Sequence, residues 1–143
     1  MDKTLTSQGQ GDTRQTLLII DDDAEWTEVL KLYFVDKYQV RVANLAAEAI
    51  DIVRDDPPSV IIVDLVMPSI DGFGAIHRIK DASQLKIPTV LLTGWKTPEV
   101  EECAASVGCA AVLSKPVSLP ALGQVIAAMM SGAAAAGAGR IVH

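Results

Sequence analysis

The sequence predicts an α/β fold in which a five-stranded parallel sheet is covered by helices on both faces. Short runs of branched residues are apolar throughout, which is typical of strands buried on both sides. Segments with helical spacing of apolar residues separate these runs. The alternation favours parallel strands joined by right-handed crossovers. With 143 residues, 50% of them hydrophobic, the chain fits one domain with a single core.

The predicted strands differ in how clearly they are marked. Three are apolar at every position or nearly so, namely TLLII (16–20), VIIV (60–63) and TVLLT (89–93). YQVRVA (38–43) and AAVL (110–113) are weaker candidates, because they are more polar or shorter.

Five segments between and after these strands carry apolar stripes at helical spacing. The stripes are Trp26, Val29, Leu30, Tyr33 and Phe34; Ala46, Ala49, Ile50 and Val53; Phe73, Ile76 and Ile79; Val100, Cys103, Ala104 and Val107; and Leu119, Leu122, Val125, Ile126 and Met129. Capping residues mark several ends: Asp23, Thr97-Pro98 and Ser118 are expected to begin helices, and Gly108 to end one.

Composition narrows the function classes. The net charge is −6 and the 12 basic residues are scattered, which argues against direct nucleic-acid binding. No apolar run approaches the roughly 20 residues that span a bilayer, and the N-terminus lacks the apolar core of a secretory signal. Cys103 and Cys109 form neither a disulfide framework nor a metal motif, so we interpret them as small buried apolar residues. A cytoplasmic setting is expected.

The ends of the chain differ from its middle. Residues 1–15 are polar and are expected to form a flexible lead, and residues 131–143 are rich in Ala and Gly, as in a linker or a frayed helix end. The predicted domain therefore covers residues 16–130. Whether it stands alone or belongs to a longer protein stays open.

Charged and polar residues follow four of the predicted strands. The first strand ends in Asp21-Asp22-Asp23, the third in Asp64, the fourth in Thr93, and the fifth leads to Lys115. Because the carboxyl ends of parallel strands meet at one edge of a sheet, these side chains are expected to converge there.

These residue types suit phosphoryl transfer. Two carboxylates 4 Å apart repel by roughly 4 kcal/mol at an effective dielectric near 20, so the cluster needs a counter-charge. Oxygen ligands beside open solvent suit Mg²⁺. A carboxylate can accept a phosphoryl group, and Thr93 and Lys115 could each contact a phosphoryl oxygen. Asp23 is more simply interpreted as a helix cap.

Four segments, LLIIDDD, VDLVMPSIDG, TVLLTG and LSKP, resemble in this order the receiver family of response regulators in two-component signalling. The resemblance covers residues 16–130 and implies a flavodoxin-like, doubly wound sheet with strand order 2-1-3-4-5. It implies that Asp64 is the phosphoacceptor. It also implies that Asp22, Asp21 and Asp64 bind Mg²⁺ together with the backbone carbonyl of Val66. Thr93 then corresponds to the switch hydroxyl, and Lys115 to the family's lysine, followed by a cis bond to Pro116.

The resemblance also implies partners. The phosphodonor is a sensor histidine kinase or histidine phosphotransfer protein, docking around Glu25, Glu28 and Val117–Leu119. Output to a downstream protein, and a homodimer if one forms, would use the fourth helix, fifth strand and fifth helix. Such a module phosphorylates itself without turning over a substrate. Val112 departs from the family, which usually has Tyr or Phe there, and Val117 replaces a frequent Phe.

Two alternatives remain open at this stage. A phosphatase of the haloacid dehalogenase type also uses Asp, Mg²⁺, Thr and Lys, but its nucleophile ends the first strand, and Glu25 stands where its motif requires Thr. A degenerate receiver that only binds proteins is the other alternative, although the full set of acceptor, metal, hydroxyl and lysine residues speaks against it.

Overall fold

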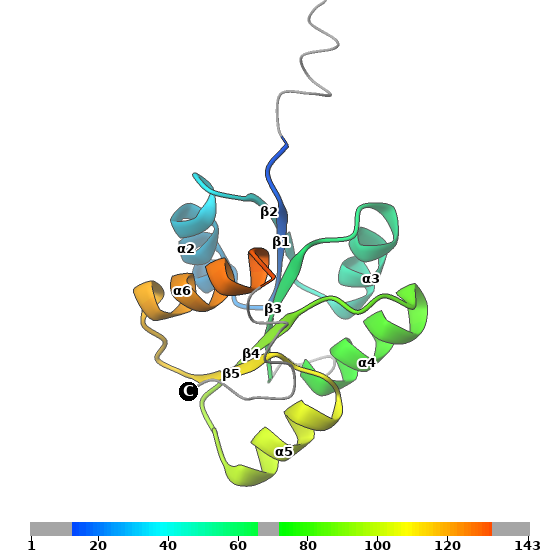
Figure 1. Cartoon of the computed structure of the whole chain (residues 1–143), viewed down its shortest axis with the longest axis vertical. Helices are drawn as coiled ribbons and strands as arrows, with labels where there is room; N and C mark the ends of the chain where they lie inside the picture. Colours follow the sequence, from blue (N-terminus) through cyan, green and yellow to red (C-terminus); the bar gives the residue numbers. More distant parts are fainter. Residues whose placement is uncertain (1–12, 66–71, 133–143) are drawn as a thin grey trace, which may run out of the picture.

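The computed structural model describes residues 13–65 and 72–132, and they form one parallel sheet between two layers of helices (Figure 1). The strand order is β2-β1-β3-β4-β5, which confirms the predicted order and fold class. The strands are β1 (Thr16–Ile20), β2 (Gln39–Ala43), β3 (Val60–Asp64), β4 (Thr89–Thr93) and β5 (Ala111–Ser114). All four neighbouring pairs are parallel, so every strand ends at the same edge.

The helices divide between the faces of the sheet as the connections require. They are α2 (Ala24–Phe34), α3 (Ala46–Asp55), α4 (Gly72–Ser83), α5 (Pro98–Ser106) and α6 (Leu119–Met130). Figure 1 shows α2 and α6 on one face, with α3, α4 and α5 on the other. The predicted lead (1–15) and the predicted tail (131–143) lie mostly outside the described residues. Of these two segments, the structure describes only residues 13–15 and 131–132.

The central strands are buried at every position, as their uninterrupted apolar runs predict. β1, β3 and β4 have no exposed residue, because helices cover both of their faces. Alternate residues therefore enter different cores. Leu17 and Ile19 pack with α2 and α6, whereas Leu18 and Ile20 pack with the opposite layer.

Local capping signals proved reliable. Asp23 accepts hydrogen bonds from the N–H groups of Glu25 and Trp26, which begins α2. Thr97 and Ser118 cap α5 and α6 in the same way. Gly108, with φ of +84°, ends α5: its N–H donates to Ala105, and the next N–H donates to Ala104. These four predictions are confirmed.

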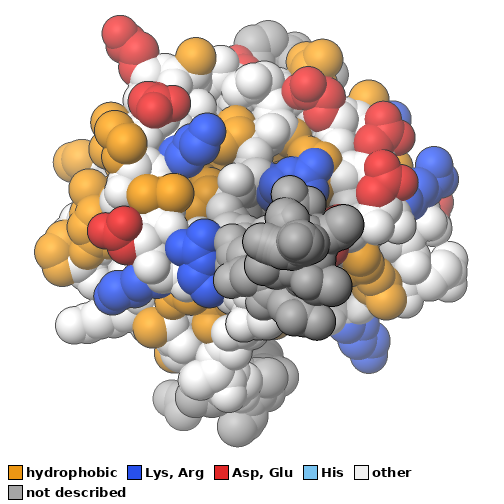
Figure 2. Space-filling model, turned by 90° about the horizontal axis from the view of Figure 1, so that it is seen from above, with side chains coloured by type: hydrophobic (Ala, Val, Ile, Leu, Met, Phe, Trp, Pro, Cys, Tyr) orange, Lys and Arg blue, Asp and Glu red, His pale blue; other side chains and the backbone are white. Residues whose placement is uncertain are grey.

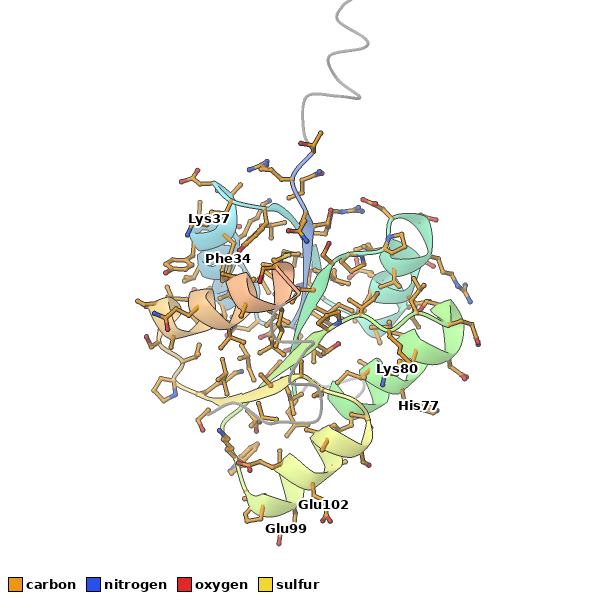
Figure 3. All side chains as sticks on the ribbon, in the orientation of Figure 1. Phe34, Lys37, His77, Lys80, Glu99 and Glu102 are labelled. Atoms are coloured by element: carbon orange, nitrogen blue, oxygen red, sulfur yellow. The ribbon has the colours of Figure 1, made fainter. Side chains whose placement is uncertain are left out.

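Two side-chain predictions were wrong. Val29 and Tyr33 were expected to face the core with Leu30 and Phe34, yet they are 44% and 42% exposed. Leu30 and Phe34 are buried as predicted, and Thr27 is the third buried residue of α2. The side chain of Phe34, labelled in Figure 3, packs in the core that α2 and α6 share. Cys103 is exposed, whereas Cys109 is buried as predicted; both are free thiols.

One face of the molecule shows how charge is distributed on the surface. On the face drawn in Figure 2, Lys and Arg side chains are interspersed with Asp and Glu, so this face carries no uniform basic patch. Among the described residues, no helix is both long and apolar enough to cross a bilayer.

Candidate functional site

Four strand ends bring the predicted polar residues to one edge of the sheet. Asp21 directly follows β1, Asp64 ends β3, Thr93 ends β4, and Lys115 directly follows β5. Backbone hydrogen bonds continue past the strands and fix these ends. The N–H of Leu65 donates to the carbonyl of Leu92 at 2.9 Å, and the N–H of Lys115 donates to that of Thr93 at 2.8 Å.

Three carboxylates form a cluster at this edge. One oxygen each from Asp21, Asp22 and Asp64 lies within 4.8 Å of the others. Asp21 and Asp64 are buried, at 2% and 7% exposure, whereas Asp22 is exposed to solvent. Asp23, the fourth acidic residue considered, is occupied in capping α2. The cluster can therefore be reached from solvent on the side of Asp22, whereas Asp21 and Asp64 are enclosed by the protein.

The surroundings of Asp21 disfavour its charged form. The pKa of Asp21 is raised from 3.8 to about 6, chiefly by burial, and the neighbouring Asp64 and Asp22 act in the same direction. The N–H of Asp23, which donates to Asp21 Oδ1 at 3.0 Å, and the Lys115 ammonium oppose this shift. The surroundings of Asp21 therefore favour its neutral form more than water does.

Lys115 forms an ion pair with Asp64. Its Nζ lies 2.7 Å from Asp64 Oδ1, and its side chain is 35% exposed. The Lys115–Pro116 peptide bond is cis, as the resemblance implied. The ammonium is therefore within reach of any group carried by Asp64 while still in contact with solvent.

Thr93 is held by its own loop. Its side chain is buried, and its Oγ1 accepts a hydrogen bond from the N–H of Trp95 at 2.9 Å. The hydroxyl proton can still be donated elsewhere. Trp95 itself is 64% exposed, so most of its surface faces solvent.

The chain beyond Asp64 returns close to that residue at Gly72. An ideal Cβ on Gly72 would lie 2.5 Å from the Asp64 carbonyl oxygen, and its N–H donates to the Leu65 carbonyl. Only glycine fits this approach between a strand end and a helix start. Val66, whose carbonyl was expected to bind the metal, lies outside the described residues.

Sequence reasoning missed Asn44, which directly follows β2. Its side-chain Nδ2 donates to the carbonyl oxygen of Asp21 at 2.9 Å. The strand-end rule that identified the other residues applies equally to the second strand, and would have pointed to this amide.

The donor set fits Mg²⁺. All three clustered groups are carboxylates, which are hard oxygen ligands, and the exposed Asp22 leaves one side of the cluster open to solvent, where Mg²⁺ would keep water ligands. A cation beside Asp21 would favour the charged form of its carboxyl group, which burial and the neighbouring carboxylates disfavour. The described residues that would hold the ion are Asp21, Asp22 and Asp64.

Comparison with known proteins identifies a family. The family model for the response regulator receiver domain matches residues 17–127. The chain is 27% identical over 109 residues to the polar-differentiation response regulator DivK of Brucella ovis, covering 76% of this chain and 89% of that protein. A receiver domain protein of Methanospirillum hungatei JF-1, described as CheY-like, has the same fold, with a TM-score of 0.77 at 20% identity, covering 85% and 97% of the two chains.

One relative is much longer than the matched segment. A probable cyclic di-GMP phosphodiesterase of Vibrio cholerae is 31% identical over 108 residues, which is 75% of this chain but only 24% of that protein. The match therefore supports a shared domain and gives no reason to transfer the phosphodiesterase activity.

Proposed function

Because the chain belongs to the response regulator receiver domain family of two-component systems, we propose that it accepts a phosphoryl group on Asp64 and signals through protein contacts. The observation that carries the proposal is the environment of Asp64. Its carboxylate joins two further carboxylates on one side and lies 2.7 Å from Lys115 on the other. The proposed module spans residues 16–130 and turns over no substrate. The phosphatase alternative loses its support, since the family match is to receivers.

The reaction proposed is a transfer between carriers. A carboxylate oxygen of Asp64 forms a bond to the phosphorus of a phosphohistidine, and the phosphorus–nitrogen bond of the donor breaks. The departing imidazole nitrogen takes up a proton. Lys115 then moves its contact from the Asp64 carboxylate to a phosphoryl oxygen, which its half-exposed position allows.

A bound Mg²⁺ supplies charge neutralisation between the incoming phosphoryl group and the acceptor. Asp21 and Asp22 would hold it beside Asp64, with Asp22 on the solvent side. Thr93 is proposed to donate its hydroxyl proton to a phosphoryl oxygen. In doing so it would pull on the loop that begins at Trp95, because Thr93 Oγ1 is bonded to that N–H.

Output is proposed to run through α5, β5 and α6, the surface that could also support a homodimer. Val112 on β5 is completely buried in the core on the α5 side. A short branched side chain cannot alternate between a buried and an exposed position as a ring can. The backbone after Thr93 must therefore carry the change, and beryllofluoride should shift the backbone resonances of residues 94–98. Unchanged resonances there would contradict this route.

The proposed phosphodonor surface combines charge and exposed apolar area. Glu25 and Glu28 are exposed on α2. Val29 and Leu32 are exposed beside them, at 44% and 66%, and an apolar patch of this kind is typical of a partner contact. A sensor histidine kinase or histidine phosphotransfer protein is the partner class that provides phosphohistidine.

Mass spectrometry tests the acceptor. After treatment with acetyl phosphate and Mg²⁺, we expect one added phosphoryl group on the wild type and none on Asp64→Asn. Asp23→Asn is the matched control, because Asp23 is adjacent to the cluster but caps α2. Equal labelling of Asp64→Asn and the wild type would refute the assignment.

The docking surface can be tested separately from the chemistry. Leu32→Asp should slow transfer from a phosphorylated histidine phosphotransfer protein while leaving labelling by acetyl phosphate unchanged. His77→Asp on α4, also exposed but on the other face, is the control. Equal transfer rates for Leu32→Asp and wild type would remove α2 from the docking surface.

A further inference from the structure

Asn44 connects the end of β2 to the end of β1. The two strands run in register up to Ile20 and Ala43, and the N–H of Asp21 donates to the Ala43 carbonyl at 3.1 Å. One residue further along β2, the Asn44 side-chain amide donates to the Asp21 carbonyl at 2.9 Å. Both the N–H and the carbonyl of Asp21 therefore form hydrogen bonds with residues at the end of β2, although Asp21 lies beyond the last paired residue of β1.

Asn44 is itself fixed by the next helix. Glu48, in the first turn of α3, accepts the N–H of Asn44 at 2.8 Å and the N–H of Leu45 at 3.1 Å through one carboxylate oxygen. Leu45, at the N-cap position, has no side chain that can accept a hydrogen bond. Glu48 therefore caps the N-terminus of α3 by accepting the backbone N–H of Leu45. The amide of Asn44 thus projects from a backbone segment that α3 holds in place.

The carbonyl bound by Asn44 belongs to the peptide group that joins Asp21 to Asp22. Because a peptide group is planar, fixing its carbonyl direction also fixes the direction of the Asp22 N–H and constrains where the Asp22 Cα lies. The Asp22 carboxylate must lie within 4.8 Å of those of Asp21 and Asp64 to complete the cluster. Repulsion among the carboxylates acts against this arrangement, so a restraint from outside the cluster has a clear use.

We propose that Asn44 is a positioning residue for the metal site, acting through the Asp21–Asp22 peptide group. This inference rests on the proposed function, since it concerns the same three carboxylates. A neutral amide suits the role because it donates a hydrogen bond to the carbonyl without adding a fourth negative charge. Asn44 does not need to contact the ion or the phosphoryl group.

The test compares Mg²⁺ affinity with folding stability. Mg²⁺ binding is followed by NMR, using the amide resonances of Asp22 and Asp23, and unfolding is followed in urea. Asn44→Ala should weaken Mg²⁺ binding by about threefold to tenfold, the range that one lost hydrogen bond produces in an equilibrium constant. Ser83→Ala is the matched control. Ser83 bonds the Ile79 carbonyl and the Leu85 N–H at the opposite edge of the sheet, so its loss should lower stability and leave Mg²⁺ affinity unchanged.

Variants of Glu48 test the same path one step further away. Glu48→Gln keeps an oxygen that can accept the two N–H groups and should bind Mg²⁺ like the wild type. Glu48→Ala removes the acceptor and should weaken binding, by less than Asn44→Ala does.

The outcomes separate the two proposals. If the wild type binds Mg²⁺ and Asn44→Ala binds it equally well, the positioning role is overturned, whatever happens to stability. Equal weakening by Ser83→Ala would also overturn it, because the effect would then follow general destabilisation. If the wild type itself binds no Mg²⁺, the metal assignment in the proposed function fails, and this inference fails with it.

Discussion

At the carboxyl edge of the sheet, ionisable side chains from several strand ends lie close together. At the amino edge, polar side chains instead form hydrogen bonds with backbone carbonyls near helix ends. The carboxyl edge buries Asp21 and Asp64 together, and Asp21 has a raised pKa as a result. At the amino edge, Lys80 on α4 donates to the Val107 carbonyl at the end of α5 (Figure 3). The carboxyl edge thus holds three carboxylates beside one ammonium group, that of Lys115, whereas the amino edge pairs a lysine with the negative end of a helix.

The two edges are therefore expected to serve different purposes: residues at the carboxyl edge serve binding and phosphoryl transfer, and residues at the amino edge serve stability. Three clustered carboxylates with a single ammonium beside them destabilise the folded chain unless a further cation binds. A lysine at a helix C-terminus stabilises it, typically by 0.3–1 kcal/mol. Substitutions at the two edges should therefore have opposite effects on stability, and only those at the carboxyl edge should change binding of Mg²⁺ or phosphate.

The largest expected effect is the loss of Mg²⁺ binding in Asp22→Ala. Asp22 is the exposed member of the cluster, so its removal takes away a ligand without leaving an unpaired buried group. Titration calorimetry should detect no saturable binding, and Asp21→Asn should retain weakened binding. The same affinity in Asp22→Ala and wild type would show that the metal is held elsewhere.

A smaller effect is expected at the mouth of the site. Trp95 is 64% exposed and two residues beyond Thr93, and it offers no carboxylate or amide that could orient a water molecule. We predict that the phosphorylated state is long-lived and that Trp95→Glu shortens its lifetime by about tenfold, since a positioned water attacks more often. Phosphate release from labelled protein, without a phosphatase, measures this. Matching decay rates would exclude a shielding role for Trp95.

The burial of Asp21 at the carboxyl edge predicts a pH dependence of stability. The pKa of Asp21 rises from 3.8 to about 6 on folding, so between these values the folded chain binds more protons than the unfolded chain. Its free energy of unfolding should therefore fall as pH rises from about 4 to 6, by at most about 3 kcal/mol from this group.

Asp21→Asn should remove that dependence and stabilise the metal-free protein above pH 6, with little gain below pH 4. Urea unfolding at pH 4, 5, 6 and 7 without Mg²⁺ compares the two proteins. A variant that is less stable than the wild type at pH 7 would contradict the account, because it would mean that the Asp21 carboxylate contributes more than its burial costs.

The smallest effect is expected at the amino edge. Lys80→Met keeps much of the apolar stem against Ile76, Ile79 and Ile87 but removes the ammonium at the end of α5. We expect a loss of about 1 kcal/mol in unfolding free energy and no change in Mg²⁺ affinity or in labelling by acetyl phosphate. A changed Mg²⁺ affinity would show that the two edges are energetically coupled.

Much of the fold could be predicted because its signals are local. The central strands are apolar at every position, since both faces are covered, and Asp23, Thr97, Ser118 and Gly108 act within one helical turn. Strand ends then located the polar residues of the candidate site, because all ends of a parallel sheet meet at one edge. The strand order came from the family resemblance.

Only the tertiary structure decided which residues of each apolar stripe are buried and which side chain forms a hydrogen bond with the backbone of the carboxylate cluster. Helical periodicity places Val29 and Leu30 on neighbouring positions, but the width of contact with the sheet leaves Val29 exposed and Leu30 buried. The bond from Asn44 to Asp21 joins residues 23 positions apart, and it depends on the register of β1 against β2. Sequence determines local conformation through short-range sterics and hydrogen bonds, whereas contacts between distant residues exist only once the strands have been aligned.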